Sequence, residues 1–370
     1  MRPAFSSTRQ AAAFGLLLLA VLLLPLAFPR SLLPPRSEVY SSIWWANGDF
    51  PYIDQQVFRT NGDIDVLFIG ASHLWGGINT PEVQAALGRA LGRPAVARTF
   101  GWGGPGYDQM YFITADLLAH RRVRLLVLDD VYADSDAPHA LAPHWFRYGD
   151  DWNKLAGLPS SLKAAYYLAS ITGMPRTLLG LVRPNLPAEF DPHRKTYWEI
   201  HSHELNPVAS LGAGIAQIGF RAAPLAEPDP FAPFTPQTGA QPADVCVYSP
   251  ATASNFSFAT DAPPPGQRHF LRKFVALAQT NGCQLVMLHV PTFAERRSTK
   301  IVTSARWPDL LPPNAALVGI PPATLFQGLS DEDVRKLYSD SVHFNQNGQE
   351  YFTELVLPTL LRLYDSGKTF

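Results

Sequence analysis

The chain has 370 residues, of which 46% are hydrophobic and 16% are charged, and its formal net charge is −1. This length and apolar content suffice for one large core with elaborations. The near-neutral charge provides no basic surface of the kind that binds nucleic acid, so no such partner is expected. The 34 prolines indicate long irregular connections rather than an all-helical body.

The N-terminal segment differs in character from the rest of the chain. Residues 11–29 (AAAFGLLLLAVLLLPLAFP) carry no charge and follow Arg2 and Arg9. Nineteen such residues are enough to span a bilayer, and no cleavage site of the A-x-A type follows them. Residues 1–30 therefore predict a signal anchor, a single transmembrane helix in the inner membrane, with a cleaved signal peptide as the alternative. Arginines also follow the run, so charge barely decides the orientation.

The next segments predict a linker and then one α/β domain. Residues 31–62 mix prolines with aromatic residues and are interpreted as a juxtamembrane linker. Residues 63–367 follow as the main domain, interrupted at about 184–265 by a lid-like insertion that holds 14 of the 34 prolines. The predicted strands are 64–70, 94–100, 123–131 and 283–291. The predicted helices are 80–91, 106–121, 150–180, 267–282 and a last helix that ends near 364, and Thr80 is the expected cap of the first of them.

This alternation predicts a doubly wound parallel sheet between two layers of helices. In such a sheet, ligands bind at the carboxyl ends of the strands. Ser72 follows the first strand, the glycine-rich stretch 101–106 the second, and Asp129 and Asp130 the third, while residues 340–345 (DSVHFN) open the last helix. We expect these four segments to meet at one edge of the sheet.

The residue types at this edge suit nucleophilic catalysis. Serine attacks well only when a base takes its proton, and His343 can act as that base near neutral pH. Asp340, three residues upstream, can orient the imidazole and stabilise its charged form. Gly103 and Gly104 allow backbone N–H groups to approach an oxyanion, together with the N–H of Ser72. The sequence indicates no metal site and no cofactor.

The motifs resemble those of the SGNH (GDSL-like) hydrolases. Gly-Ala-Ser followed by Gly76 is similar to their first block, and D-x-V-H-F-N-x-x-G, Asp340 to Gly348, is similar to their last. The likeness covers roughly residues 62–365 and implies a three-layer, flavodoxin-like fold with Ser72, Asp340 and His343 as a triad. It is closest to membrane-anchored periplasmic members, the alginate O-acetylation and DltD-like proteins.

Two positions depart from the pattern of that family. Three residues near the proposed site, His73, Trp75 and Trp102, each have two interpretations. Ala71 stands where aspartate is common, and the third strand ends in LDDVYAD without the asparagine that serves the family as an oxyanion donor. An ionised carboxylate cannot donate in its place. His73 is interpreted as a packing residue with a weaker reading as a substrate contact. Trp75 and Trp102 are interpreted as packing residues, with a second reading as stacking surfaces for a sugar ring.

The resemblance implies an O-acyltransferase, with acetyl as the expected group, that acts on a polysaccharide outside the cytoplasm through an acyl-serine. It also implies an acyl donor supplied by a multi-spanning membrane partner. An esterase with the same triad is the alternative, and a non-catalytic glycan-binding envelope protein is a third reading that the missing asparagine favours. Cys246 and Cys283 can pair in an oxidising compartment, a question that the sequence leaves open.

Overall fold

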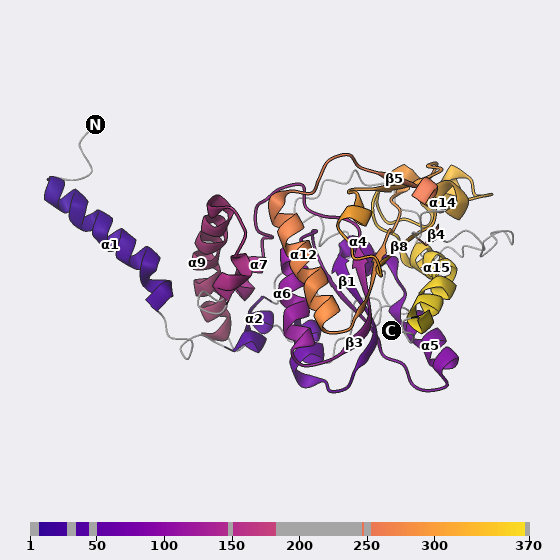
Figure 1. Ribbon diagram of the computed structural model, residues 1–370, viewed down its shortest axis with the longest axis horizontal. Coiled ribbons are helices and arrows are strands. Elements are labelled where there is room, and N and C mark those ends of the chain that lie inside the picture. The colour runs from indigo at the N-terminus through magenta and orange to yellow at the C-terminus, as the bar shows by residue number, and fades with distance from the viewer. Residues whose placement is uncertain are drawn as a thin grey trace.

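Figure 1 shows the protein as a computed structural model, which describes residues 7–27, 35–43, 50–146, 151–182, 246–247 and 253–366. Five parallel strands form the centre of the molecule in the order β2-β1-β3-β6-β8, and a short antiparallel strand, β4, extends the β8 edge. The strands are β1 (Ile64–Ala71), β2 (Ala97–Trp102), β3 (Val123–Asp129), β4 (Cys246–Val247), β6 (Gln284–Leu288) and β8 (Ala316–Gly319).

This strand order confirms the predicted α/β fold with a parallel sheet. The chain builds outward from β1 in both directions, which is the doubly wound arrangement, and its switch point lies between β1 and β3. Every residue of β1 is buried, because helices cover both faces of the sheet. The four strands expected from apolar runs are β1, β2, β3 and β6, with ends that differ by up to three residues.

The two faces of the sheet belong to two separate hydrophobic clusters. On β1, Leu67 and Ile69 pack in the cluster of α6 (Tyr107–Leu118) and α12 (Pro265–Thr280). Val66 and Phe68 pack in the other, with α5 (Thr80–Leu91) and α15 (Gln346–Ser366). Figure 1 shows these two helix pairs on opposite sides of the sheet. The period-two alternation of the strand thus sets up the three-layer core.

Helix α5 begins one residue earlier than the sequence suggests. Its N-cap is Asn79, whose side chain accepts a hydrogen bond from the Glu82 N–H at 3.3 Å. The prediction of Thr80 as the cap was therefore wrong. Thr80 turns inward instead, because its hydroxyl is fully buried against the hydroxyl of Thr99 on β2.

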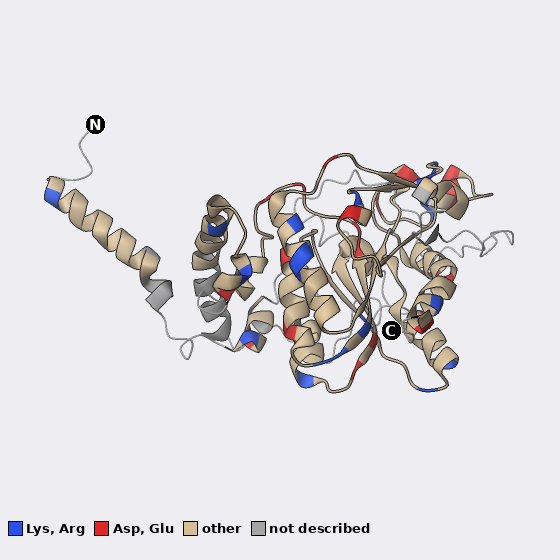
Figure 2. Cartoon of the chain, viewed as in Figure 1, with Lys and Arg blue, Asp and Glu red and all other residues tan. Residues whose placement is uncertain are grey.

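The N-terminal apolar run forms α1 (Thr8–Ala27). Phe14, Leu16 and Leu17 are among its exposed side chains, and in the part of the helix that Figure 2 colours by charge, charge lies only at its start. Among the described residues, no helix combines the length and the apolarity needed to cross a membrane. The structure therefore does not support the predicted transmembrane helix.

Much of the predicted linker, residues 31–62, belongs to the folded core. Helix α2 (Arg36–Ser42), α3 (Phe50–Asp54) and the π-helical turn η2 (Gln55–Arg59) occupy it. The Tyr40 hydroxyl donates to Asp116 at 2.8 Å, and Arg36 pairs with the same carboxylate and with Asp151. The domain therefore begins before residue 63. The sequence does not predict α2 and α3, because their apolar residues show no helical period. Six of the residues in this segment are nevertheless buried: Val39, Tyr40, Ile43, Phe50, Tyr52 and Ile53.

Of the predicted insertion at 184–265, residues 183–245 and 248–252 lie outside the described part of the chain. The described remainder contributes strands: β4 joins the sheet, and β5 (Phe256–Phe258) pairs with β7 (Ile301–Thr303). Cys283 is a buried free thiol. The other described elements are α4 (Ser72–Gly77), α7 (Ala142–Trp145), η3 (Trp152–Leu155), α9 (Ser160–Val182), η5 (Ala253–Asn255), η6 (Phe293–Glu295), η7 (Trp307–Asp309), α13 (Pro322–Leu325) and α14 (Asp331–Arg335).

Gly101 on β2 allows α4 to lie close to the sheet. A Cβ at this position would collide with the Cβ and ring of Trp75. Gly101→Ala is expected to lower the free energy of unfolding by about 1–3 kcal/mol, the usual cost of overpacking. Gly88→Ala is the control, since its nearest contact of 3.4 Å leaves room for a methyl group inside a helix. Urea denaturation measures both, and equal stabilities would contradict the close packing.

Candidate active site

The structure brings Ser72, His343 and Asp340 together at the carboxyl ends of the strands. Ser72 begins α4 directly after β1, and its Oγ lies 3.0 Å from Nε2 of His343. The other ring nitrogen, Nδ1, lies 2.8 and 3.0 Å from the two carboxylate oxygens of Asp340. Since Asp340 accepts the proton of Nδ1, Nε2 is left to accept one from the serine hydroxyl.

The loop of residues 339–344 holds the acid and the base in a fixed relation. The Asp340 carboxylate accepts the backbone N–H groups of Val342 and His343, both at 2.7 Å. Ser339 donates its N–H to the His343 carbonyl at 2.9 Å. Burial raises the pKa of Asp340, but the hydrogen bonds from the His343 ring and from the backbone outweigh it and hold that pKa below its usual range. Asp340 is therefore a carboxylate at neutral pH.

Helix α15 ties the serine to the histidine across the length of the chain. The Gln349 side chain donates to the Ile78 carbonyl at 2.9 Å, and the Thr353 hydroxyl accepts the Asn79 N–H at 2.8 Å. Ile78 and Asn79 directly follow α4, which carries Ser72, while α15 directly follows the loop of His343. The two halves of the site are thus fixed to each other outside the reacting groups.

The glycine-rich turn lies beside the nucleophile. Ala71 pairs with Trp102 across β1 and β2, so the residues that follow each strand, Ser72 and Gly103, end at the same edge. Gly104 has a φ of +84°, a value that favours glycine. His139 lies against this turn, with Nε2 3.2 Å from the Gly103 carbonyl. Gly103 and Gly104 as sources of oxyanion N–H groups stay a prediction, which this placement favours.

The two tryptophans near the serine are core residues. Trp102 is fully buried, and Trp75 is only 6% exposed. Trp102 belongs to the cluster of α6 and α12, while Trp75 rests on Gly101. The reading of Trp75 and Trp102 as stacking surfaces for a sugar is therefore corrected, because neither ring has a face open to a ligand.

His73 lies inside the site, although no described residue hydrogen bonds to its ring. It is 6% exposed, and both ring nitrogens are buried without a hydrogen-bond partner among the described residues. Nδ1 is 3.9 Å from Asp129 Oδ1, and the ring centre is 6.4 Å from that of His343, nearly perpendicular to it. Asp129 is fully buried at the end of β3, and its Oδ2 likewise lacks a described partner.

A second buried group lies next to this pair and was missed from the sequence. His289 follows β6, with Nδ1 2.9 Å from Asp130 and Nε2 3.5 Å from Glu295. Burial lowers the pKa of His289, but the charge of Asp130, with Glu295, outweighs this and raises that pKa to about 10. Burial raises the pKa of Glu295, and the contacts with His289 and Thr292 lower it to about 2. His289 is therefore an imidazolium between two carboxylates.

This cluster supports the loop of residues 339–344, which carries Asp340 and His343. Glu295 ends η6, and the N–H of Phe293 in the same turn donates to the Ser341 carbonyl at 3.1 Å. The Tyr338 hydroxyl donates to the Pro291 carbonyl at 2.8 Å. The sequence places His289 within the predicted strand 283–291 and indicates neither its position at the ligand-binding edge nor its partners.

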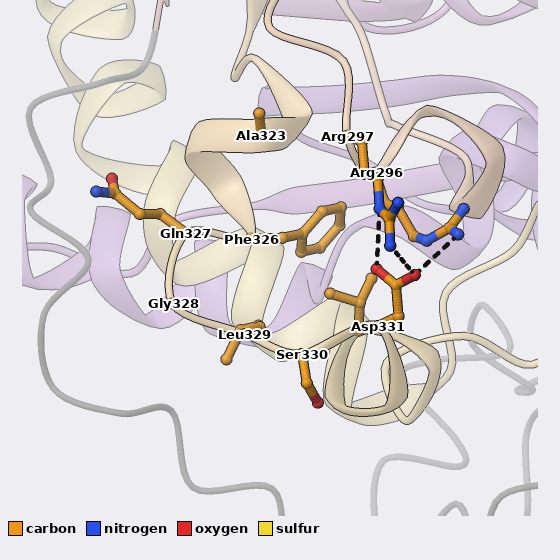
Figure 3. Close-up of a pocket in the computed structure, with 10 residues that line it drawn as sticks. Arg296, Arg297, Ala323, Phe326, Gln327, Gly328, Leu329, Ser330 and Asp331 are labelled. Carbon is orange, nitrogen blue, oxygen red and sulfur yellow. Dashed lines mark hydrogen bonds and ion pairs between the residues drawn. The ribbon is translucent and has the colours of Figure 1, made fainter.

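A surface cavity of about 640 Å³ lies beyond this loop (Figure 3). Asp331 accepts hydrogen bonds there from Arg297 at 2.6 Å and from Arg296 at 3.1 Å, as Figure 3 shows. The lining holds no histidine, and its arginines are paired with Asp331. In the described part of the chain, no three His, Cys, Asp or Glu side chains are arranged to hold a metal ion.

Comparison with known proteins adds no family. No protein-family model matches the chain, and no curated protein is significantly similar to it.

His289 gives the stability of the protein a pH dependence of known sign. A pKa raised from 6.5 to about 10 in the folded state contributes stability that is complete below about pH 6.5 and lost as pH rises to about 10. His289→Gln should therefore lower the free energy of unfolding more at pH 6 than at pH 9, measured by urea denaturation.

His269→Gln is the matched control. Burial lowers the pKa of His269, so the sign is opposite and its loss should cost no more at pH 6 than at pH 9. If His289→Gln lowers the free energy of unfolding equally at both pH values, His289 is not an imidazolium between Asp130 and Glu295.

Proposed function

We propose that the protein is an O-acyltransferase that carries an acyl group, acetyl in the first instance, on Ser72. The observation that carries this proposal is the chain of contacts from Ser72 Oγ to His343 and on to Asp340. His343 takes the serine proton as Oγ attacks the acyl carbon of the donor ester, and it returns this proton to the leaving oxygen. In the second half, His343 takes the proton of an acceptor hydroxyl as its oxygen attacks the acyl carbon, and it returns this proton to Ser72 Oγ as the bond between Oγ and the acyl carbon breaks.

Transfer and hydrolysis use the same triad and differ in the acceptor. Ser72 is 7% exposed and His343 is 3% exposed, so burial limits the access of water and of a sugar hydroxyl alike. Hydrolysis by the same triad, as in an esterase, uses water in place of the acceptor and is the outcome against which transfer must be tested.

The acceptor and the location are further parts of the proposal. The proposed polysaccharide acceptor outside the cytoplasm and the multi-spanning membrane protein that delivers the acyl group rest on the motifs that resemble SGNH acyltransferases. The proposed attachment to the inner membrane rests on the uncharged run of residues 11–29.

Acylation of Ser72 is the direct test. The full-length chain, incubated with p-nitrophenyl acetate and quenched in acid, should gain one acetyl group on the peptide that contains Ser72, as read by mass spectrometry. Ser72→Ala and His343→Ala should each reduce p-nitrophenolate release by several orders of magnitude, because members of a triad act as a unit. Asp340→Asn should retain more activity, since it disturbs the orientation of the base without removing it.

An added acceptor separates the possible outcomes. With acetylated enzyme and a neutral oligosaccharide, transfer predicts acetyl esters on the sugar, whereas an esterase releases only acetate. A wild-type protein that never acquires the label, although it is folded by circular dichroism, contradicts the enzyme reading and favours a glycan-binding protein. Ser72→Ala controls for labelling at lysines, which should be the same in both proteins.

A further inference from the structure

His139 has no part in the proposed triad, yet its ring holds one peptide group of the glycine-rich turn. Nε2 lies 3.2 Å from the Gly103 carbonyl oxygen, and Nδ1 accepts the N–H of Leu141 at 3.3 Å. A carbonyl only accepts and a backbone N–H only donates, so these two contacts require a proton on Nε2 and none on Nδ1. Burial lowers the pKa of His139, which favours the same neutral form. His139 is therefore a neutral imidazole that donates to Gly103.

The same contact sets the direction of the Gly104 N–H. This N–H and the Gly103 carbonyl belong to one peptide group, and no peptide bond of the described chain is cis. In a trans peptide the C=O and the N–H point in opposite directions. The Gly104 N–H therefore points away from His139, and no described residue accepts a hydrogen bond from it. Since Gly104 is partly exposed, the turn presents a free backbone donor at a border of the site that is open to solvent.

The backbone of His139 is held in place independently of its ring. Its N–H donates at 2.8 Å to Asp108, a fully buried residue in the first turn of α6 whose carboxylate also accepts the Tyr166 hydroxyl at 2.6 Å. Gly106 leaves the space that this arrangement needs, because a Cβ there would lie 3.0 Å from the Cβ of His139. Substitutions of the ring therefore leave the position of the main chain at residue 139 fixed.

We propose that His139 is a positioning residue, which holds the peptide between Gly103 and Gly104 so that the Gly104 N–H donates to the oxyanion on the acyl group of Ser72. This inference rests on the proposed acyl-serine. Ser72 and Gly103 directly follow the paired ends of β1 and β2, which places the turn beside the reacting oxygen. Hydrogen bonds in a chain polarise one another, so the bond that the Gly103 carbonyl accepts also makes the Gly104 N–H a stronger donor.

Two substitutions in the full-length chain each keep one of the two contacts of the His139 ring. In His139→Gln, the side-chain N–H takes the place of Nε2 as the donor to Gly103. In His139→Asn, the side-chain oxygen takes the place of Nδ1 as the acceptor for Leu141, an arrangement that Asn commonly forms with the N–H two residues on. The shorter Asn side chain leaves the Gly103 carbonyl without its donor.

His139→Asn should slow p-nitrophenyl acetate turnover at least about tenfold, toward the 10²–10³-fold loss that removal of one oxyanion donor causes. The effect should fall on kcat with little change in KM, because the oxyanion develops only in the transition state. His139→Gln should recover most of this loss. His269→Gln, which removes the contact of a histidine on α12 with the Lys154 carbonyl, should keep wild-type turnover. A role confined to holding Leu141 predicts the reverse order, with Asn more active than Gln.

A sulfur-substituted ester separates positioning of the oxyanion donor from a merely structural role. The thiocarbonyl sulfur of p-nitrophenyl thionoacetate accepts hydrogen bonds poorly, so an enzyme with a strong oxyanion site prefers the oxygen ester. This preference should fall several-fold in His139→Asn and stay near that of the wild type in His139→Gln. Both esters report on the same folded fraction of the enzyme, so partial unfolding of a variant leaves the ratio of the two rates unchanged.

Three results would overturn the role of His139 while labelling of Ser72 in the wild type still supports the acyl-serine. They are a His139→Asn protein at least as active as His139→Gln, an unchanged preference between the two esters in His139→Asn, and a His139→Asn protein that is unfolded by circular dichroism, which would make His139 a structural residue. If the wild type itself fails to label, the acyl-serine is wrong and the role of His139 falls with it.

Discussion

The hydrogen bond between Ser72 and His343 connects residues that are 271 positions apart, and the rest of the site depends on it. The bond forms only if the end of β1 and the start of α15 are held at the right relative position, because a hydrogen bond tolerates a change of only a few tenths of an ångström in its length. The parallel sheet satisfies the first half of this requirement, because all five of its parallel strands end at one edge. Helix α15 satisfies the second half, since it contacts the residues that follow α4 and carries the histidine loop at its own start.

An unusually large number of buried polar and titratable side chains lies at this edge of the sheet. His73, Asp129, Asp130, His289 and His343 are all at least nine-tenths buried. The imidazolium of His289 balances Asp130 and Glu295, which keeps the loop of Pro291 and Phe293 against the catalytic loop. The neighbouring pair of His73 and Asp129 is left less complete. No described residue hydrogen bonds to the His73 ring, whereas ion pairs with Asp130 and Glu295 hold the His289 ring.

The sequence predicts the parts of the fold that local pattern controls. β1, β3 and β6 are apolar runs too continuous to be anything but buried strands, and in a parallel sheet their carboxyl ends alone place Ser72 and Asp129 at one edge. The pairing of Asp340 with His343 follows from a spacing of three residues. In contrast, β8 has four residues and β4 has two, and pairing with neighbours, not their own composition, makes them strands.

The features that could not be predicted from the sequence depend on where side chains point in the folded protein. Trp75 lies three residues after the serine and Trp102 ends the neighbouring strand, but the Trp102 ring packs in the helix layer, away from any ligand. α2 and α3 resemble a linker because their prolines and aromatics have no helical period, yet tertiary contacts such as that of Tyr40 with Asp116 bury them. The partners of His289 are Asp130, directly after β3, and Glu295 on η6, and no local pattern connects these segments.

The distance along the chain between Ser72 and His343 has a consequence for folding during translation. Translation at about 5–20 residues per second separates the emergence of Ser72 from that of His343 by roughly 15–55 s. For most of that interval β1, α4 and β3 are already available to fold, but Ser72 lacks its contact with His343. The contact between Ser72 and His343 therefore forms only after the chain has been made through residue 343 and α15 has docked.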